Sequence, residues 1–423
     1  SYIFISVLFF SNFSLCGQIY DYETEIFLNK LIQDIKAVNK FNKNIKLHII
    51  KDDNPNAFVI PKNKLIVSSG LIEQSPDYVS LLAVLAHEIG HLENFHLEKR
   101  KDTLEKFSKL NLISNLALIT GSILAQEPQV LGGTLASQVN INNFYLSFSR
   151  EQEREADLYS IKTLQKLNLP SESTKELLNI LEKNALERGL DENYHKFSTH
   201  PIFRERYEII DYNSKNKIFN FNNKTQDEFN FIKTKFMAYN DTLNQAKLND
   251  DNRIYYDSIY SSKSGNLIIS LEKINFLIKK FPKNFFFLET KGDILRSHGY
   301  LNESVKFYKI VLNKFPDNYY IKYKIFLDTN TINMESNDKI NFFYENLNLI
   351  IKFPKNKYII NKFIKITKDL EKIYWLNFFN IINDTRNKDM AELHKKLNNL
   401  SKETNEIKLK KIINEYNKLW EVL

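Results

Sequence analysis

The spacing of apolar residues predicts an α+β unit in the first half of the chain. Apolar positions three and four apart over 18–41 predict an amphipathic helix. Short alternating or apolar runs follow at 45–51, 57–60 and 65–68, the last two separated by a turn sequence, which predicts a small antiparallel sheet. A Leu- and Ala-rich stretch over about 78–98 predicts a second helix.

The second half of the chain contains an internal repeat. A Phe-Pro-x-Asn sequence stands at 281–284, 315–318 and 353–356, each time after an apolar helical segment. The first two copies are one tetratricopeptide period of about 34 residues apart, and the third is slightly further on. These spacings predict stacked helix pairs, with an unrelated helical bundle as the alternative. The close-contact, turn, small and aromatic positions of one such repeat fall on Gly292, Gly299, Ser304 and Tyr308.

Two apolar stretches bear on export and membrane contact. Residues 1–17 resemble the end of a secretory signal peptide whose start is missing; an uncleaved anchor and a hydrophobic first helix are the alternatives. Residues 110–139 are apolar but are interrupted by polar groups and by Pro128, which disfavours a continuous membrane helix. We expect two packed helices there, with a lid or a membrane-touching hairpin as the alternative.

Composition narrows the function without defining it. The chain of 423 residues has a formal net charge of +8, but its lysines are spread along the whole length rather than gathered in a stripe. We therefore expect no nucleic-acid partner. Cys16 is the only cysteine, so the chain forms no internal disulfide and no cysteine zinc cluster.

The candidate chemistry lies in the second predicted helix. His87, Glu88 and His91 form an HExxH motif in an apolar context. On a helix the two histidines lie about 40° apart and one turn along the axis, so both rings can bind one metal ion. Buried imidazoles and a carboxylate need partners, and Zn²⁺ would supply them, one ion per chain. Glu88 is then placed to act as general base and acid on water.

A third ligand is predicted downstream, in the acidic segment 149–157. Glu153 and Asp157 are four residues apart and share one face of a helix, whereas Glu151 and Glu155 point about 160° away. We predict Glu153 as the ligand and Asp157 as the acceptor for the second ring nitrogen of a zinc-bound histidine. A solvated acidic helix is the alternative reading.

His96 is the other residue near the motif that could bind the metal. On one continuous helix it points roughly 140° away from His91. We therefore predict a helix-surface residue, or one that supports a ligand, rather than a ligand itself. The metzincin pattern would require Gly and His at positions that hold Asn94 and Leu97 instead.

These motifs together resemble a known peptidase family. Asn56–Val59, Ser69–Leu71, Leu85–His91, Ser149–Asp157 and Thr199–Pro201 are similar, in this order, to segments of the zinc peptidases that include the CAAX prenyl protease, HtpX and the BepA-type periplasmic proteases. The resemblance spans about 20–210 and is strongest to the BepA type, because helical repeats follow. It implies a gluzincin active site in which His87, His91 and Glu153 bind zinc and Glu88 is catalytic.

The resemblance adds further expectations. His200 is expected to cap the open zinc position or to act in the reaction, and Arg206 to lie near it. The strand of Asn56, Ala57, Phe58 and Val59 is expected to bind substrate by main-chain pairing. The resemblance implies a periplasmic enzyme, with a peripheral membrane contact as a further expectation, that acts on unfolded or misassembled outer-membrane proteins. The repeats would contact these clients or the outer-membrane assembly machinery.

The expected organisation is therefore a truncated signal peptide, a mostly helical α+β metallopeptidase domain with a small sheet, a linker, and an all-α domain of tetratricopeptide-like repeats. Two rival functions remain: a chaperone or scaffold whose zinc site is latent, and an integral membrane peptidase of the HtpX kind. The predicted segments are 1–17, 18–215, 216–250 and 251–423.

Overall fold

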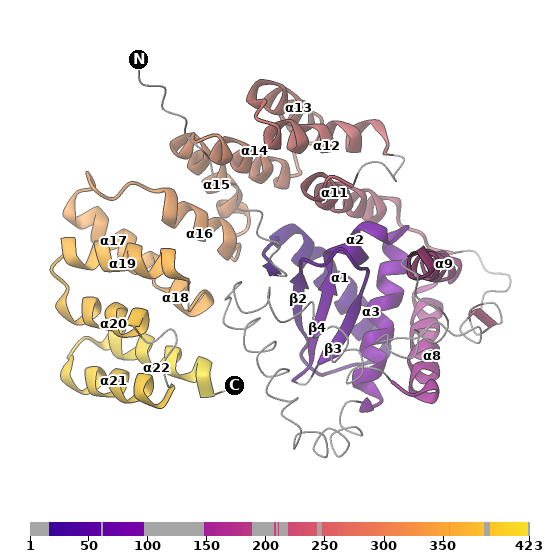
Figure 1. Ribbon diagram of the computed structural model, residues 1–423, viewed down its shortest axis with the longest axis horizontal. Coiled ribbons are helices and arrows are strands. Elements are labelled where there is room, and N and C mark those ends of the chain that lie inside the picture. Colours follow the sequence, from indigo (N-terminus) through magenta and orange to yellow (C-terminus); the bar gives the residue numbers. More distant parts are fainter. Residues whose placement is uncertain are drawn as a thin grey trace.

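The computed structural model of the chain describes residues 17–60, 62–96, 148–187, 207–208, 210, 219–242, 248–354, 356–384 and 390–421. In this part the fold is α+β: a small sheet with helices against it, followed by a long succession of helices (Figure 1). The predicted fold class is confirmed at this level. Residues 1–16 and 110–139, and with them the predictions of a leader and of a membrane-touching hairpin, lie outside the described residues.

The sheet has four strands in the order β1-β2-β4-β3. The hairpin of β3 and β4 is antiparallel, as predicted, but β2 and β4 pair in parallel, so the expectation of a purely antiparallel sheet was wrong. The reason is that β3 lies at the edge of the sheet. The chain then turns back as β4, which lies between β2 and β3 and runs in the direction of β2. The strands are β1 (Gln18–Ile19), β2 (Lys46–Ile50), β3 (Ala57–Ile60) and β4 (Lys64–Ser68).

Helix α3 lies in the core of the α+β part of the fold. Its first turn is closed by a capping box between Asp77 and Ser80, and every residue except Val84 and Glu93 is buried. This burial explains its high content of Leu and Ala, since both sides of the helix face protein. The helices of this part are α1 (Tyr22–Asn39), α2 (Ser69–Gln74), α3 (Tyr78–Glu93), α8 (Arg150–Leu167) and α9 (Glu172–Glu187).

The predicted linker 216–250 contains a packed helix, α11 (Asn223–Asn240). One side of α11 puts Phe229 and Ile232 into the core of the α+β part, and another puts Phe231 and Met237 into the first core of the following helices. The interval is therefore a shared wall between two cores over the length of α11, and not a linker. Its Asn- and Lys-rich composition concealed these apolar positions.

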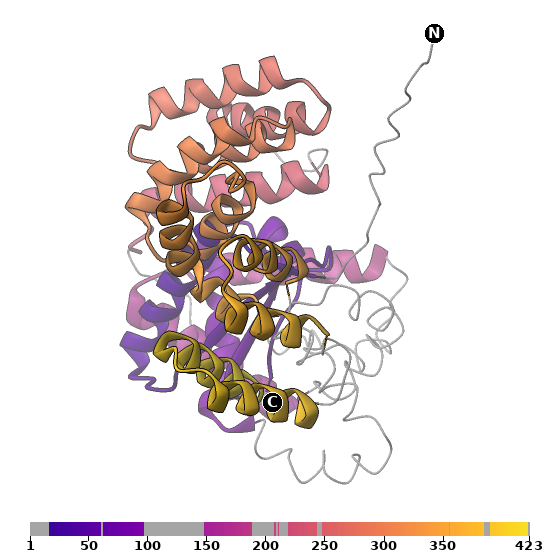
Figure 2. The same cartoon turned by 90° about the vertical axis from the view of Figure 1, so that its left-hand side faces the viewer.

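The helices after α11 form an arc over and beside the α+β part, visible in both views (Figures 1 and 2). Each Phe of the Phe-Pro-x-Asn sequences caps the end of one helix. Each Asn then accepts a hydrogen bond from the first turn of the next, so the sequence is a helix-to-helix turn. The helices are α12 (Asp250–Lys263), α13 (Leu267–Lys280), α14 (Phe286–Ser297), α15 (Leu301–Lys314), α16 (Tyr319–Asp328), α17 (Ser336–Asn346), α18 (Asn348–Lys352), α19 (Lys357–Asp369), α20 (Ile373–Asp384), α21 (Met390–Glu403) and α22 (Ile407–Glu421).

The hairpin of α14 and α15 shows why its sequence positions are restricted. A Cβ on Gly292 would lie 2.5 Å from the ring of Tyr308, so only glycine allows this contact. Ser304 is fully buried and Gly299 lies in the turn between the helices. The four positions that the sequence singled out therefore form one close helix–helix contact and its turn.

Among the helices that the structure describes, none combines the length and the apolar composition that a membrane span requires.

A buried ionic cluster fastens α1 to α11. Lys235 Nζ lies 2.6 Å from Asp21 Oδ2 and 2.7 Å from Glu23 Oε2. Burial alone would raise the pKa of Asp21, but the charge and hydrogen bond of Lys235, together with Thr24, lower it. Asp21 is also the N-cap of α1, since its side chain accepts from the Thr24 N–H. One lysine thus holds the first turn of α1 against the shared wall.

Replacing Lys235 by methionine is expected to destabilise the chain by about 3–5 kcal/mol, because two largely buried carboxylates lose their cation. The matched control is Lys280→Met, which breaks the half-exposed pair with Asp251 and is expected to cost under about 1 kcal/mol. Denaturant unfolding followed by circular dichroism measures both changes. Equal effects of the two substitutions would contradict the structural role assigned to Lys235.

Candidate metal centre

The HExxH residues of α3 all lie in the protein interior. His87, Glu88 and His91 are buried, and the two histidines lie one turn apart on the side of α3 that faces α8. Helix α8 begins with its own capping box, in which Ser149 and Gln152 exchange hydrogen bonds. The cap fixes where α8 starts and therefore which of its residues meet α3.

Gly90 brings the two helices close together. A Cβ at this position would lie 3.0 Å from Tyr159 Cβ and 3.2 Å from Ala156 Cα, closer than ordinary packing permits. Ser160 adds a hydrogen bond of 2.7 Å from its Oγ to the carbonyl of Ala83. The contact is therefore tight at two points along α3, and it places Glu153 opposite the histidines.

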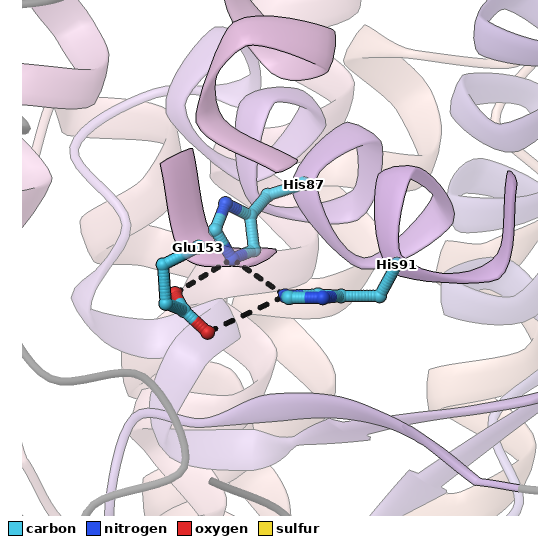
Figure 3. Close-up of side chains that lie close together, drawn as sticks. All are labelled: His87, His91 and Glu153. Atoms are coloured by element: carbon cyan, nitrogen blue, oxygen red, sulfur yellow. Dashed lines mark hydrogen bonds and ion pairs between the residues drawn. The ribbon is translucent and has the colours of Figure 1, made fainter. Parts of the chain in front are cut away.

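Three donor groups converge at this contact, as Figure 3 shows. The Nε2 atoms of His87 and His91 are 3.1 Å apart. Glu153 Oε2 lies 3.3 Å from Nε2 of His87, and Oε1 lies 3.5 Å from Nε2 of His91. The structure thus brings together the three residues that the sequence selected as ligands, including Glu153 out of three neighbouring glutamates.

This geometry fits a zinc ion. Donor atoms about 2.0–2.1 Å from one tetrahedral ion lie about 3.3–3.4 Å from each other, a spacing that falls inside the 3.1–3.5 Å spanned by the three separations. The charges of the buried side chains also favour a bound cation. Glu88, Glu153 and Asp157 are buried carboxylates beside two histidines, and a divalent cation would balance this excess of negative groups. Within the described residues, His87, His91 and Glu153 make the group with this spacing.

Asp157 lies where the sequence placed it, behind the first histidine. Its Oδ1 is 2.9 Å from Nδ1 of His87, which leaves Nε2 of that ring directed at Glu153. Burial alone would lower the pKa of His87, but the hydrogen bonds with Asp157 and Glu153 and their negative charges raise it. The carboxylate of Asp157 therefore sets the orientation of the ring.

The surroundings of His96 differ from the prediction. The helix was expected to continue to about residue 98, but α3 ends at Glu93 and Phe95 adopts a left-handed conformation with φ of 56°. The chain turns back, so the fully buried ring of His96 places Nδ1 2.8 Å from Nδ1 of His91. The prediction that His96 points away from His91 was wrong. The contact with His91 agrees with the other expectation, that His96 supports a ligand and is not a ligand itself.

Two further contacts around His91 were not predicted. His96 Nε2 lies 2.8 Å from Glu155 Oε2, so a third acidic residue of α8, besides Glu153 and Asp157, is connected to the site. The ring of Phe148 stacks on His91 with 3.7 Å between ring centroids and an angle of 14° between planes. Both depend on the chain path after α3 and before α8, and no local pattern in the sequence encodes that path.

The predicted substrate strand lies at the edge of the sheet and contacts α3. Ala57, Phe58 and Val59 belong to β3, which pairs with β4 on one side; no strand of the described residues pairs with the other. Asn56 precedes the strand and is held by Ser68, whose Oγ accepts from the Asn56 N–H at 2.8 Å. His200 and Arg206 lie outside the described residues, so their roles remain predictions.

A buried HExxH helix joined by a glutamate from a second helix, in an α+β fold, is the arrangement of gluzincin metallopeptidases. The sequence comparison agrees with this class: residues 25–214 match the model of peptidase family M48. The resemblance inferred from the motifs is thereby confirmed for the metallopeptidase part.

Curated relatives match a similar length of the chain. The chain is 26% identical over 189 residues to the mitochondrial metalloendopeptidase OMA1 of Schizosaccharomyces pombe, covering 44% of this chain and 52% of that protein. It is 26% identical over 189 residues to the beta-barrel assembly-enhancing protease of Yersinia pestis, covering 44% and 37%. The bovine OMA1 is 28% identical over 184 residues, covering 42% and 34%. The chain thus spans about half or less of these relatives.

Enlarging Gly90 is expected to separate α8 from α3 and to displace Glu153. We predict that Gly90→Val weakens zinc binding by at least about tenfold, with Gly90→Ala intermediate, because the extra atoms meet backbone as well as side chain. Competition with a chromophoric chelator measures the affinity. The control is Gly265→Ala, which strains a left-handed turn in the helical part and should leave zinc affinity unchanged. Wild-type affinity in Gly90→Val would contradict this account.

Proposed function

We propose that the chain is a zinc-dependent endopeptidase of the HExxH gluzincin type. The observation that carries the proposal is the convergence of His87, His91 and Glu153 within 3.1–3.5 Å, with Glu88 buried beside them on α3. A purely structural zinc site has no use for an additional buried carboxylate at this position. A peptidase site requires one.

The roles follow from the positions of the side chains. Nε2 of His87, Nε2 of His91 and the carboxylate of Glu153 would hold the ion. Bound zinc supplies Lewis-acid chemistry, polarising a carbonyl and lowering the pKa of water. Glu88 would accept a proton from the attacking water at its carboxylate and deliver it to the leaving amine.

The edge strand β3 is the element that we propose for substrate binding. Pairing of an extended chain with an exposed strand edge uses main-chain hydrogen bonds, so it suits unfolded or β-rich polypeptides of varied sequence. The contact of β3 with α3 would bring such a chain next to Glu88. Asn56, fixed to the end of β4 through Ser68, would define where the paired segment begins.

The biological role is proposed from the relatives and the helical part. One of the relatives is named a mitochondrial metalloendopeptidase and another a beta-barrel assembly-enhancing protease. We propose quality control of unfolded or stalled outer-membrane proteins in the periplasm. The tetratricopeptide-like hairpins would supply the surface for clients or for the assembly machinery. A membrane-surface contact through 110–139 and a cap by His200 belong to the same proposal.

Replacing Glu88 by glutamine is expected to lower the hydrolysis of a labelled unfolded polypeptide by about 10²–10⁴-fold, because general acid–base catalysis is lost. Zinc binding should persist, since the three ligands remain. The matched control is Glu93→Gln at the exposed end of the same helix, which should retain full turnover. Peptide products are quantified by mass spectrometry.

The same variant separates the proposal from its rival. If Glu88→Gln hydrolyses the polypeptide at the wild-type rate, the peptidase mechanism is wrong. If the wild-type chain suppresses aggregation of the polypeptide without cleaving it, the scaffold function with a latent zinc site replaces it.

A further inference from the structure

The residues around His91 form a chain that reaches from the proposed metal position to the other side of α8. His91 Nδ1 is 2.8 Å from His96 Nδ1, and His96 Nε2 is 2.8 Å from Glu155 Oε2. His91 and His96 are fully buried, whereas the side chain of Glu155 is 41% exposed. We propose that His96 and Glu155 are positioning residues that hold His91 in the one tautomer and orientation that can bind zinc. This inference rests on the proposed function.

The geometry permits one assignment of donors and acceptors along this chain with both rings neutral. A ring nitrogen that binds a metal carries no proton, so His91, with Nε2 toward the site, carries its proton on Nδ1. That N–H donates to Nδ1 of His96. A neutral His96 that accepts at Nδ1 carries its proton on Nε2 and donates it to Glu155. Each ring therefore determines the tautomer of the next, and the carboxylate defines the direction.

Helix α8 thereby supports both histidines, by different means. Asp157 contacts Nδ1 of His87 directly at 2.9 Å. Glu155, two residues earlier, lies on another side of the helix and reaches His91 only through His96. Glu153 of the same helix lies among the ligands. Alternate acidic residues of one helix would thus bind the metal, support one histidine through a second ring, and support the other directly.

The backbone around His96 supports a specific role for this ring. Phe95 has φ of 56°, a conformation that is costly for an aromatic residue. The end of α3 is held by Lys43, whose Nζ donates to the carbonyl of Leu92 at 2.8 Å and lies 3.9 Å from the ring of Phe95. The turn that returns His96 to His91 is therefore fixed at several points. An imidazole buried there without its partners would be destabilising.

The first test compares zinc affinities at fixed pH. His96→Leu is expected to bind zinc about 10–100-fold more weakly than the wild type, as found when the supporting partner of a metal-bound histidine is removed. His96→Asn should recover much of the loss, because its amide oxygen lies close to the place of Nδ1 and accepts from His91. The control is His298→Leu, a histidine at the end of α14 that contacts Ser262. The visible spectrum of the Co²⁺-substituted chain should shift in His96→Leu and in neither of the other two.

The second test uses the exposed end of the chain of contacts. Glu155→Ala is expected to weaken zinc binding in the same direction as His96→Leu. Glu151→Ala, on the same helix and 69% exposed, should have no effect. Because His96 and Glu155 act in series, the double variant should lose little beyond His96→Leu alone. His96→Leu combined with Asp157→Ala should lose more affinity than either variant alone, since these residues act on different histidines.

The outcomes separate this inference from the proposed function. Wild-type zinc affinity and an unchanged Co²⁺ spectrum in Glu155→Ala, or in a folded His96→Leu, overturn the positioning role while leaving the peptidase intact. If His96→Leu does not fold by circular dichroism, the exposed Glu155 decides. A wild-type chain whose zinc binding does not depend on His87 and His91 overturns the proposed function instead.

Discussion

The metallopeptidase part depends on the contact between α3 and α8, because this contact buries several groups that could not be buried separately. Imidazoles and carboxylates in the interior are destabilising unless each has a partner. Here the partners come from the opposite helix: Glu153 and Asp157 of α8 face His87 of α3. Gly90 removes the side chain that would keep the helices apart. The rest of the domain can be understood as what holds these two helices at this distance.

The sequence predicted the polar part of this contact because helical geometry limits the choices. Two histidines four residues apart must share a face, and so must Glu153 and Asp157, whatever the tertiary structure. The hairpin of β3 and β4 was also predictable, because it depends only on two neighbouring strands and the turn between them. The parallel pairing of β2 with β4 was not, since it depends on which strand is placed at the edge. Local periodicity contains no information about that choice.

His96 shows the limit of such reasoning in one residue. Its predicted direction followed correctly from a helix that was assumed to continue, and it failed because the helix ends at Glu93. Phenylalanine rarely adopts the left-handed conformation, so the sequence gives no reason to expect it at Phe95. The misreading of 216–250 has a related cause. Asn and Lys dominate there, yet Phe229, Phe231 and Ile232 point to two different cores. Two partly apolar faces on one helix resemble the irregular pattern of a linker.

The placement of α8 also connects the site to distant parts of the domain. Asn39 at the end of α1 donates to Thr163 at 2.8 Å and accepts from Lys166 at 2.8 Å, both on α8. The beginning of α1 is in turn held by Lys235 of α11. Because a helix moves largely as one body, a shift at either place would move Glu153, Glu155 and Asp157 together. The metal position is therefore created by docking of one helix, and the individual hydrogen bonds select ring orientation within a geometry that the docking has already set.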